Sequence, residues 1–272
     1  MIPIRLLTIS KDKVEGFEDF FDEVTEADIS EVSPEVIKGE RKVSVGEEFV
    51  EEYDAVYTQI PPQNSVFGRV LLETIEEKEI PVDNYSTAYF TAAKKNYLYY
   101  VLSKRDINCP KTVSVASEKA VRNIDQHLDF PVLGRRLEEL KETEKRKLES
   151  GDEIKSFSEG TEYEEDVLLF QELNEDTKYR CLVIDGEIIS LREGSEDWKF
   201  NAENLKYSNI SDTQKDIIKQ AYSSIGLGVV EILIRGEEIY DINPNPDLEL
   251  YSEKAGKNIF SEVADLLKRG SV

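Results

Sequence analysis

Two neighbouring apolar strands near the carboxyl end of the chain each carry one acidic residue, and this pattern constrains the fold more than any other feature. The strands are predicted at Val229–Ile234 and Glu238–Asn243, and the turn between them contains Gly236. Glu231 and Asp241 stand between apolar neighbours. An acid in a strand that packs on a core needs a partner or access to water. The pattern therefore predicts a hairpin in which each strand carries one carboxylate that has a partner or access to water.

The side chains of Glu231 and Asp241 can lie opposite each other on one face of this hairpin. Asn243 follows Asp241 by two residues, so it projects from the same face. Two carboxylates and an amide oxygen form an all-oxygen site of the kind that Mg²⁺ prefers, with phosphate oxygens and water as further ligands. The alternative from spacing alone is that both acids are solvated on an exposed sheet face.

The negative net charge of the chain disfavours binding to nucleic acid. It contains 57 acidic and 34 basic residues, so its net charge is -23. Binding to nucleic acid depends on basic patches that contact phosphates, and a field of this sign repels them. We therefore expect no nucleic-acid partner.

Cysteine and histidine are too scarce for several kinds of site. The chain has two cysteines, Cys109 and Cys181, and one histidine, His127. Zinc sites, heme ligation and catalysis by Cys–His or Ser–His pairs therefore lack their residues. Two free thiols suit a reducing cytoplasm. No apolar run approaches the roughly 18 residues that span a bilayer, so we expect no membrane partner.

The first 85 residues predict a small open α/β domain with a mostly parallel sheet. An apolar run at Ile4–Ile9 and a short run at Ala55–Thr58 indicate strands. Asp19–Glu23 is predicted to be helical, as is Phe67–Lys78, where apolar residues recur at helical spacing. A further short strand is expected at residues 80–84. Strands that alternate with helices are typical of this fold class.

Residues 86–166 predict a central unit. Helices are expected at Ser86–Lys104 and Ser117–His127, and a strand follows each of them. The charged run Glu138–Ser150 is expected to be a mobile loop or an exposed helix.

Residues 167–272 predict an α+β unit. Five strands are expected, and the helix Asp212–Ile225 between them should end at Gly226. The strands form an antiparallel sheet and are predicted at residues 167–171, 179–184, 187–192, 229–234 and 238–243.

The hairpin resembles the metal-binding signature of the ATP-grasp superfamily, in particular of its RimK-like carboxylate–amine ligases. The similar run reads Gly-Leu-Gly-Val-Val-Glu-Ile-Leu-Ile, then Glu-Ile-Tyr-Asp-Ile-Asn-Pro-Asn-Pro. The resemblance makes Glu231, Asp241 and Asn243 the metal ligands, with the two acids exchanged relative to the usual order. It implies an ATP-grasp fold in which an N-terminal pre-ATP-grasp domain (1–85) precedes a central lobe with a lid (86–166). A C-terminal lobe (167–272) then clamps the nucleotide against that central lobe.

Further motifs of the family follow in order over residues 84–246. Lys95 resembles the first nucleotide-contacting lysine of the family. Arg135 occupies the position of the second, phosphate-contacting lysine. The glycine-rich phosphate loop of the family is reduced here to Ser150–Ile154, which leaves open how this loop closes over the phosphates. Arg180 and Arg192 resemble the arginines that bind substrate and neutralise the transferred phosphate, so they are the expected catalytic residues. The remaining expected nucleotide contacts are Gln171, Glu172, Leu173, Asp176 (with Glu175 as the alternative acid for the ribose), Lys199 and Asn201.

The resemblance implies an enzyme that joins a carboxylate to an amine through an acyl phosphate, with ATP and Mg²⁺ as cofactors and Mn²⁺ as an alternative ion. Small-molecule or peptide substrates are its expected partners, and assembly into a homo-oligomer stays open. Two other functions compete: a nucleotide-binding protein of this fold that has lost turnover, and a structural acidic protein with an unrelated fold.

Overall fold

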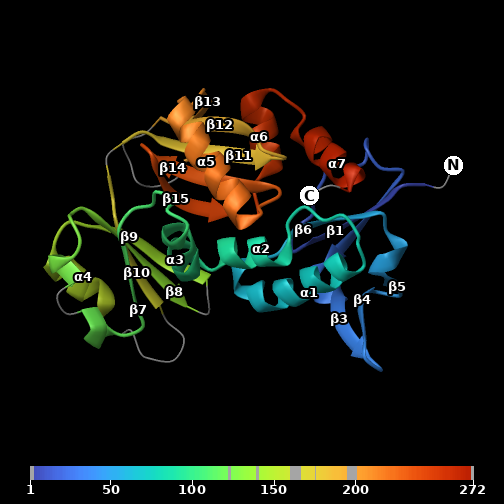
Figure 1. The fold of residues 1–272 in the computed structure, drawn as a ribbon, viewed down its shortest axis with the longest axis horizontal. Coiled ribbons are helices and arrows are strands. Elements are labelled where there is room, and N and C mark those ends of the chain that lie inside the picture. The colour runs from blue at the N-terminus through green and yellow to red at the C-terminus, as the bar shows by residue number, and fades with distance from the viewer. Residues whose placement is uncertain are drawn as a thin grey trace.

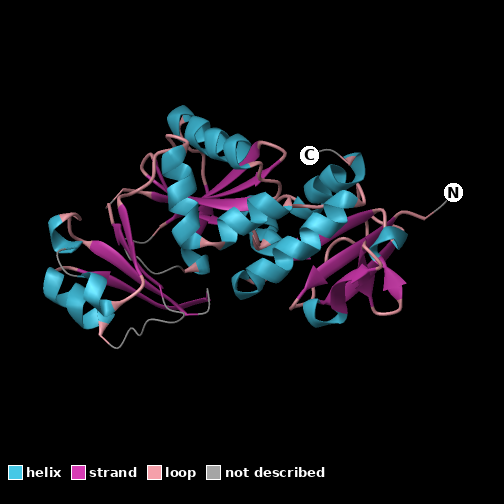
Figure 2. Ribbon diagram, turned by 60° about the horizontal axis from the view of Figure 1, so that its bottom comes forward, coloured by secondary structure: helices cyan, strands magenta, loops and turns pink. Residues whose placement is uncertain are grey.

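The structure is a computed structural model that describes residues 3–121, 124–138, 141–159, 167–174, 176–194 and 201–270. In these residues the chain forms four β-sheets. Both views place the central sheet and the N-terminal sheets at opposite ends of the molecule, with the C-terminal sheet between them (Figures 1 and 2). No helix in the described part of the chain has the length and apolar character to span a membrane.

The N-terminal unit is built on a parallel sheet with the strand order β2-β1-β6, as the sequence predicts. The helix expected at Asp19–Glu23 is wrong. The chain makes a turn there, in which the N–H of Phe20 donates to the carbonyl of Phe17, and then enters β2. A small antiparallel sheet with the order β3-β4-β5, which the sequence analysis missed, lies between β2 and β6 in the chain. The strands are β1 (Arg5–Ser10), β2 (Glu23–Asp28), β3 (Val32–Ile37), β4 (Glu40–Val45), β5 (Glu48–Phe49) and β6 (Ala55–Gln59).

Three helices follow, and they connect this unit to the rest of the chain. Helix α1 spans Ser65–Glu77, close to the prediction. The single helix expected at Ser86–Lys104 is divided into α2 (Ser86–Ala93) and α3 (Lys95–Lys104). Lys94 separates them because its backbone, with ψ of 86°, is not helical. The strand expected at residues 80–84 is reduced to one bridge between Val82 and Val56.

The central sheet is antiparallel, with the order β7-β10-β8-β9. Three predictions fail here. The charged run expected to be a loop or an exposed helix forms strand β9. The strand expected at residues 167–171 in the C-terminal unit lies between β7 and β8. In place of the helix expected at Ser117–His127, the described residues form two short 3₁₀ turns. The elements are β7 (Thr112–Val115), β8 (Val132–Glu138), β9 (Lys141–Leu148), α4 (Gly151–Ser158) and β10 (Val167–Glu172).

The C-terminal sheet is antiparallel, with the order β13-β12-β11-β14-β15. Helix α5 occupies the predicted residues and ends at Gly226, which adopts a left-handed conformation. Apolar side chains of α5 pack on the face of the sheet that carries Ile232 and Ile242. The elements are β11 (Lys178–Ile184), β12 (Glu187–Glu193), β13 (Leu205–Tyr207), α5 (Asp212–Ile225), β14 (Val230–Arg235), β15 (Glu238–Asn243), α6 (Leu248–Ala255) and α7 (Ile259–Arg269).

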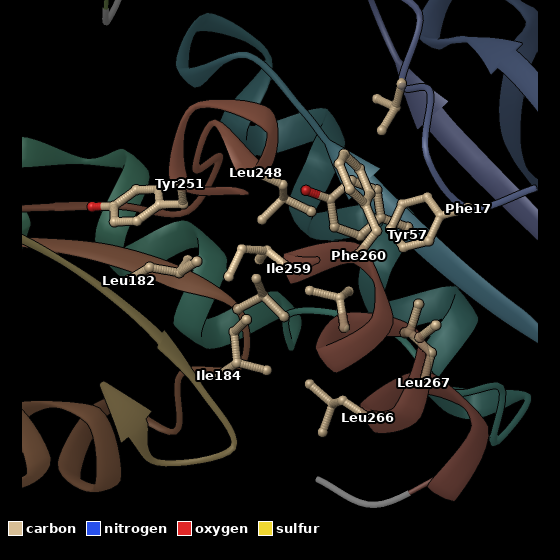
Figure 3. Packing of buried hydrophobic residues seen from close by; sticks show 14 of the residues in the cluster. Phe17, Tyr57, Leu182, Ile184, Leu248, Tyr251, Ile259, Phe260, Leu266 and Leu267 are labelled. Carbon is tan, nitrogen blue, oxygen red and sulfur yellow. The ribbon is translucent and has the colours of Figure 1, made fainter. Parts of the chain in front are cut away.

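One hydrophobic core joins the N-terminal unit to the C-terminal sheet. Figure 3 shows Phe17 and Tyr57 of the N-terminal unit beside Phe260 of α7, with Leu182 of β11 in the same cluster. The ring centroids of Phe17 and Phe260 are 5.1 Å apart in an edge-to-face arrangement. Burial of large apolar side chains on both sides of this contact stabilises the arrangement of the two units.

A buried polar junction fixes the same two units near the ends of β6 and β14. The carboxylate of Asp83 accepts hydrogen bonds from the backbone N–H and the hydroxyl of Thr58 at 2.7 and 2.9 Å. The side chain of Asn84 accepts from the N–H of Gly228 and donates to the carbonyl of Val229. Burial raises the pKa of Asp83 to about 7, and the hydrogen bonds from Thr58 oppose that rise. The junction holds the C-terminal hairpin against the N-terminal unit.

Replacing Gly228 by alanine should disrupt this junction. A Cβ atom at this position would lie 1.8 Å from the carbonyl oxygen of Asp83, so the backbone must shift. We expect the free energy of unfolding to fall by about 3 kcal/mol, the upper end for overpacking a close-fitting site. Gly256→Ala is the control, because its Cβ would meet no atom within 4 Å and only the left-handed backbone costs about 1 kcal/mol. Urea unfolding of both variants measures the difference, and equal losses would contradict the proposed close contact.

Candidate active site

The three oxygen-bearing side chains of the hairpin share one face of the C-terminal sheet. In the register of β14 and β15, Glu231 lies opposite Asn243, and Asp241 lies opposite Leu233. Ile232 and Ile242 point to the other face and are fully buried there. The period of two along each strand therefore brings Glu231, Asp241 and Asn243 together, with Asp241 diagonal to Glu231 rather than directly opposite.

Asp241 is held by two cations from other parts of the chain. Its Oδ1 lies 2.5 Å from Nζ of Lys95, and its Oδ2 lies 3.4 Å from Nη1 of Arg135. The N–H of Ile242 donates to Oδ1 at 2.8 Å. Burial by itself would raise the pKa of Asp241, but the charges of Lys95 and Arg135 outweigh it and lower the pKa to about 2. Asp241 is therefore an anion at neutral pH.

Glu231 belongs to a second charged network. Its Oε1 accepts from Nη1 of Arg180 at 2.7 Å, and its Oε2 accepts from the hydroxyl of Tyr251 at 3.0 Å. Nε of Arg180 also donates to Glu193 at 3.0 Å, and Nζ of Lys178 lies 3.1 Å from the same carboxylate. Arg180 thus links the carboxylates of two strands and is oriented by both.

Asn243 is positioned by a turn at the end of β15. Its Oδ1 accepts from the N–H of Asn245, and its Nδ2 donates to the carbonyl of the same residue. Asn245 donates in turn to the carbonyl of Ile60 at 2.7 Å, and Gln59 donates to the carbonyl of Pro246 at 3.3 Å. The end of β6 and the loop that follows it therefore lie directly beside the end of the β14–β15 hairpin.

A small cavity opens between the central sheet and the C-terminal sheet next to these groups, with a volume of about 40 Å³. Five of its lining side chains are cations and one is an acid, in a chain whose net charge is -23. A cluster of cations beside two carboxylates suits the phosphates of a metal–nucleotide complex. The charged lining consists of Arg135, Lys145, Lys178, Arg180, Glu193 and Arg235.

The uncharged lining of the cavity is apolar and comes from both sheets. Leu133 of β8 and Leu173 after β10 face Leu233 of β14 and Tyr240 of β15 in one small cluster. Apolar side chains from two sides offer the flat faces of a purine base a place to pack. The site thus combines an apolar end with a cationic end.

Arg135 has an unusual position for a charged residue. Its side chain is only 2% exposed, and the carboxylate of Glu142 lies 3.5 Å from its Nε. Among the described residues no acceptor makes a hydrogen bond to that Nε. A buried guanidinium N–H without an acceptor fits a site that receives an anionic group.

The segment after β10 lies between the central sheet and the C-terminal sheet, but its polar groups already make hydrogen bonds within the protein. The N–H of Leu173 donates to the carbonyl of Pro131 at 2.9 Å, and the N–H of Asn174 donates to the hydroxyl of Tyr240. Glu172 accepts from Nζ of Lys111 and from the N–H of Asp129. In this arrangement the side chain of Leu173, rather than its N–H, lines the cavity.

Gln171 is buried on β10, and its Nε2 lies 3.4 Å from the hydroxyl of Thr112. Its Oε1 has no hydrogen-bond partner in the described structure. Asp176 is exposed and lines a separate open hollow with Glu172, Glu237 and Glu238. Neither Gln171 nor Asp176 lines the cavity.

Two further predicted site residues are not brought to the cavity. Arg192 is exposed, and it is paired in the sheet with Tyr179, on the face opposite Glu193. Asn201 caps the short helical turn that begins at Ala202, where its Oδ1 accepts from the N–H of Glu203. The predicted contact Lys199 and the alternative ribose acid Glu175 lie outside the described residues.

The sequence analysis missed four charged residues of the site: Lys145, Lys178, Glu193 and Arg235. Lys178 is two residues before Arg180, so alternation along a strand could have placed it on the same face. Lys145 lies opposite Arg135 in the pairing of β8 and β9, a signal that was hidden while its segment was expected to be a loop.

The oxygen donors available for a metal are the carboxylates of Glu231 and Asp241 and the amide of Asn243. In the described part of the chain no group of three acidic, histidine or cysteine residues stands ready to hold a metal. Two carboxylates and one amide leave half of an octahedral Mg²⁺ shell for phosphate oxygens and water, which is the usual arrangement for nucleotide-bound Mg²⁺. The donor set therefore fits Mg²⁺ together with a nucleotide.

Comparison with known proteins shows the family of the chain. Residues 92–267 match the model of the RimK-like ATP-grasp domain. The chain is similar to a probable alpha-L-glutamate ligase from Haemophilus influenzae, with 24% identity over 230 residues that cover 80% of this chain and 76% of the relative.

Solved structures share the fold over nearly the whole chain. The ATP-grasp ligase PsnB, solved with a minimal precursor, superposes with a TM-score of 0.72 at 18% identity and covers 99% of both chains. D-alanine–D-alanine ligase from Bacillus anthracis gives a TM-score of 0.66 at 14% identity, with 98% of each chain covered. The chain therefore belongs to the RimK-like ATP-grasp family of ATP-dependent carboxylate–amine ligases.

Proposed function

We propose that this protein uses Mg²⁺ and ATP to phosphorylate the carboxylate of an amino acid or peptide, and that an amine then displaces the phosphate to form an amide. One observation carries the proposal: five cations line a cavity beside the carboxylates of Glu231 and Asp241, although the chain as a whole is strongly acidic. Phosphoryl transfer depends mainly on positioning and on neutralising charge, and these side chains supply both.

The nucleotide would lie across the cavity with its base at the apolar end, between Leu133 and Leu233. Its phosphates would reach the cationic end at Arg135, Lys145 and Arg180. Because the cavity of about 40 Å³ has room for little more than water, the central and C-terminal sheets must move apart to admit it. ATP-grasp ligases of related fold have been solved with ADP and Mg.

Glu231, Asp241 and Asn243 would hold Mg²⁺, which supplies positive charge at the transferred phosphate. Mn²⁺ suits the same oxygen donors. In the structure Lys95 and Arg135 already neutralise Asp241, so the metal alone has to compete with two cations. Phosphates would draw Lys95 and Arg135 toward themselves and release the carboxylate. We therefore expect the affinity for Mg²⁺ to be much higher when nucleotide is present.

Arg180 would orient the substrate carboxylate or the transferred phosphate, since its guanidinium is held between Glu193 and Glu231. No protein nucleophile is needed. Burial raises the pKa of the Cys181 thiol well above its usual range, so it is not a thiolate at neutral pH. The two free thiols, Cys109 and Cys181, support a reducing compartment such as the cytoplasm.

The substrate side of the site would be the loop after β6, because it contacts Asn245 and Pro246 at the end of the hairpin. Similar proteins act on, or were solved with, amino acids and peptides: a probable glutamate ligase and ligases bound to precursor, leader and core peptides. An amino acid or a peptide is thus the proposed source of the carboxylate and of the amine.

The alternative is a protein that binds the nucleotide without turnover. The departure at Ser150–Ile154, where the family has a glycine-rich loop, favours this second candidate. The two differ in one measurement: both give a thermal shift with Mg-ATP, but only the ligase releases ADP when amino-acid or peptide pairs are added.

Asp241→Asn should abolish most turnover in a chain that still folds, with a lower free energy of unfolding because buried Arg135 loses its counter-charge. The amide keeps the shape but removes the charge that attracts the metal, so kcat/KM for ATP should fall by about 10²–10³. ADP release at several Mg²⁺ concentrations measures the effect, and urea unfolding without nucleotide checks the fold. Asp216→Asn, an exposed position on α5, is the matched control. Unchanged activity in the Asp241 variant would show that the metal site is wrongly assigned.

Lys145→Met should weaken nucleotide binding without lowering the stability of the nucleotide-free protein. Burial and the charge of Arg135 lower the pKa of Lys145, so its ammonium is costly to the folded protein. We expect the KM for ATP to rise about tenfold, as for the loss of one charge-assisted contact. The nucleotide-free variant should be as stable as the parent or more so.

Arg146→Met is the control for this experiment. Arg146 is adjacent on β9 and exposed, and its side chain points to the opposite face of the strand. Its KM for ATP should stay within about twofold of the parent value. Equal effects of the two variants on KM would contradict a role of Lys145 at the phosphates.

A further inference from the structure

One segment of this acidic chain contains no acidic residue. Between Asp83 and Asp106 the sequence has four basic residues and no aspartate or glutamate, while the chain as a whole has 57 acids in 272 residues. The segment forms helices α2 and α3; Figure 1 shows α2 beside α1, and α3 follows α2 on the side of the central sheet. A local reversal of charge in a chain of this composition marks a surface that faces an anionic partner.

The basic residues are arranged with exposed aromatic rings along one side of α3. Tyr97, Tyr100 and Lys104 recur at intervals of three or four residues, so they follow one face of α3. Lys94 is the residue that caps the start of α3, three residues before Tyr97. We call these four residues the α3 stripe. Tyr97 is 45% exposed and Tyr100 is 62% exposed, which is unusual for such large side chains.

The rings of the α3 stripe form an ordered row. Tyr97 and Tyr100 stack with centroids 6.2 Å apart, and Phe90 of α2 lies 6.4 Å from Tyr97. Phe90 is covered by two cations, Lys94 at 5.4 Å and Arg69 of α1 at 5.1 Å. Cations and aromatic rings thus lie side by side on this surface, and exposed aromatic side chains such as tyrosine are among the groups enriched in binding surfaces.

The cations at the two ends of the α3 stripe differ in exposure, because Lys104 is exposed and Lys94 is half-buried over the ring of Phe90. Arg69 is paired with Glu73, but neither Lys94 nor Lys104 makes an ion pair within the described ranges. Lys95, by contrast, points to the other side of α3 and binds Asp241. The α3 stripe is therefore separate from the proposed active site.

We propose that the α3 stripe docks an acidic peptide segment. Its ends, Lys94 and Lys104, are about 15 Å apart along a helix that rises about 1.5 Å per residue. An extended peptide covers that length in about five residues. The partner would carry two acidic residues about five residues apart, with apolar side chains between them that pack on Tyr97 and Tyr100.

A second copy of this chain fits the α3 stripe poorly. A symmetric contact would place the stripe against itself, so lysines would face lysines at both ends. Nucleic acid also fits poorly, because its continuous row of phosphates would run beyond the stripe onto the acidic remainder of the surface. A short peptide stays within the stripe, and screening over about 8 Å at physiological salt isolates it from distant acids.

Binding of a labelled peptide to the intact chain tests the proposal. The probe is a fluorescein-labelled peptide in which two glutamates, five residues apart, flank a leucine-rich segment. A second probe has glutamine in place of both glutamates. The variants are the double substitution Tyr100→Ala with Lys104→Glu, and Lys219→Glu as the control, which makes the same charge change on the exposed side of α5. Fluorescence anisotropy at low and high salt gives the dissociation constants.

We expect the parent chain and Lys219→Glu to bind the glutamate peptide within twofold of each other. The double variant should bind it at least tenfold more weakly, and the glutamine peptide should bind the parent at least tenfold more weakly. Urea unfolding verifies that the double variant is folded, and Lys104→Gln replaces it if it is not. Because the assay contains no ATP, its result is independent of turnover.

Three results would overturn the proposal. The first is equal binding of the glutamate peptide by the double variant and by Lys219→Glu, or no binding by the parent chain. The second is stripe-dependent binding of a labelled oligothymidine that is as tight as that of the peptide. The third is self-association in sedimentation that Tyr100→Ala abolishes, which would assign the surface to a second copy of the chain.

Discussion

The contact of Asp241 with Lys95 and Arg135 joins three parts of the chain that are distant in sequence. Lys95 comes from the start of α3, Arg135 from the central sheet and Asp241 from the C-terminal sheet. Arg135 is almost completely buried, so the charge of Asp241 is its main compensation in the described structure. Breaking a buried ion pair by removing one partner leaves an uncompensated charge, which is why the two sheets depend on this contact. In the proposed function, a metal and phosphates would have to rearrange the same contact.

The charge that lines the candidate active site is opposite in sign to the net charge of the protein. The net charge of -23 repels a nucleotide at long range, but salt screens that field over about 8 Å. Within the cavity Arg135, Lys145 and Arg180 determine the local potential. In the proposed function, Glu231 and Asp241 would then allow a cation to enter together with the phosphates. The α3 stripe repeats this principle at the surface, where a segment without acids stands out from its surroundings.

Much of the fold could be predicted because its signals are local. The acids of β14 and β15, the helix ending at Gly226 and the parallel N-terminal sheet follow from periodicity and turn residues. The segment Lys141–Leu148 could not be assigned in this way. Its charged residues have no apolar alternation, and it becomes a strand because β8 supplies the hydrogen-bonding edge. The strand Val167–Glu172 has an apolar pattern that fits either sheet, and only its pairing with β7 and β8 places it in the central one.

By itself, the sequence determined which residues of one strand share a face, because side chains alternate with a period of two. From this period alone, Glu231, Asp241 and Asn243 could be assigned to one side of the hairpin. The tertiary structure decided which side chains from separate strands meet them. It placed Lys145 and Arg235 in the lining of the cavity and left Arg192 on the opposite face of β12. The reason is that the register between strands and the packing of two sheets depend on contacts between residues far apart in the chain.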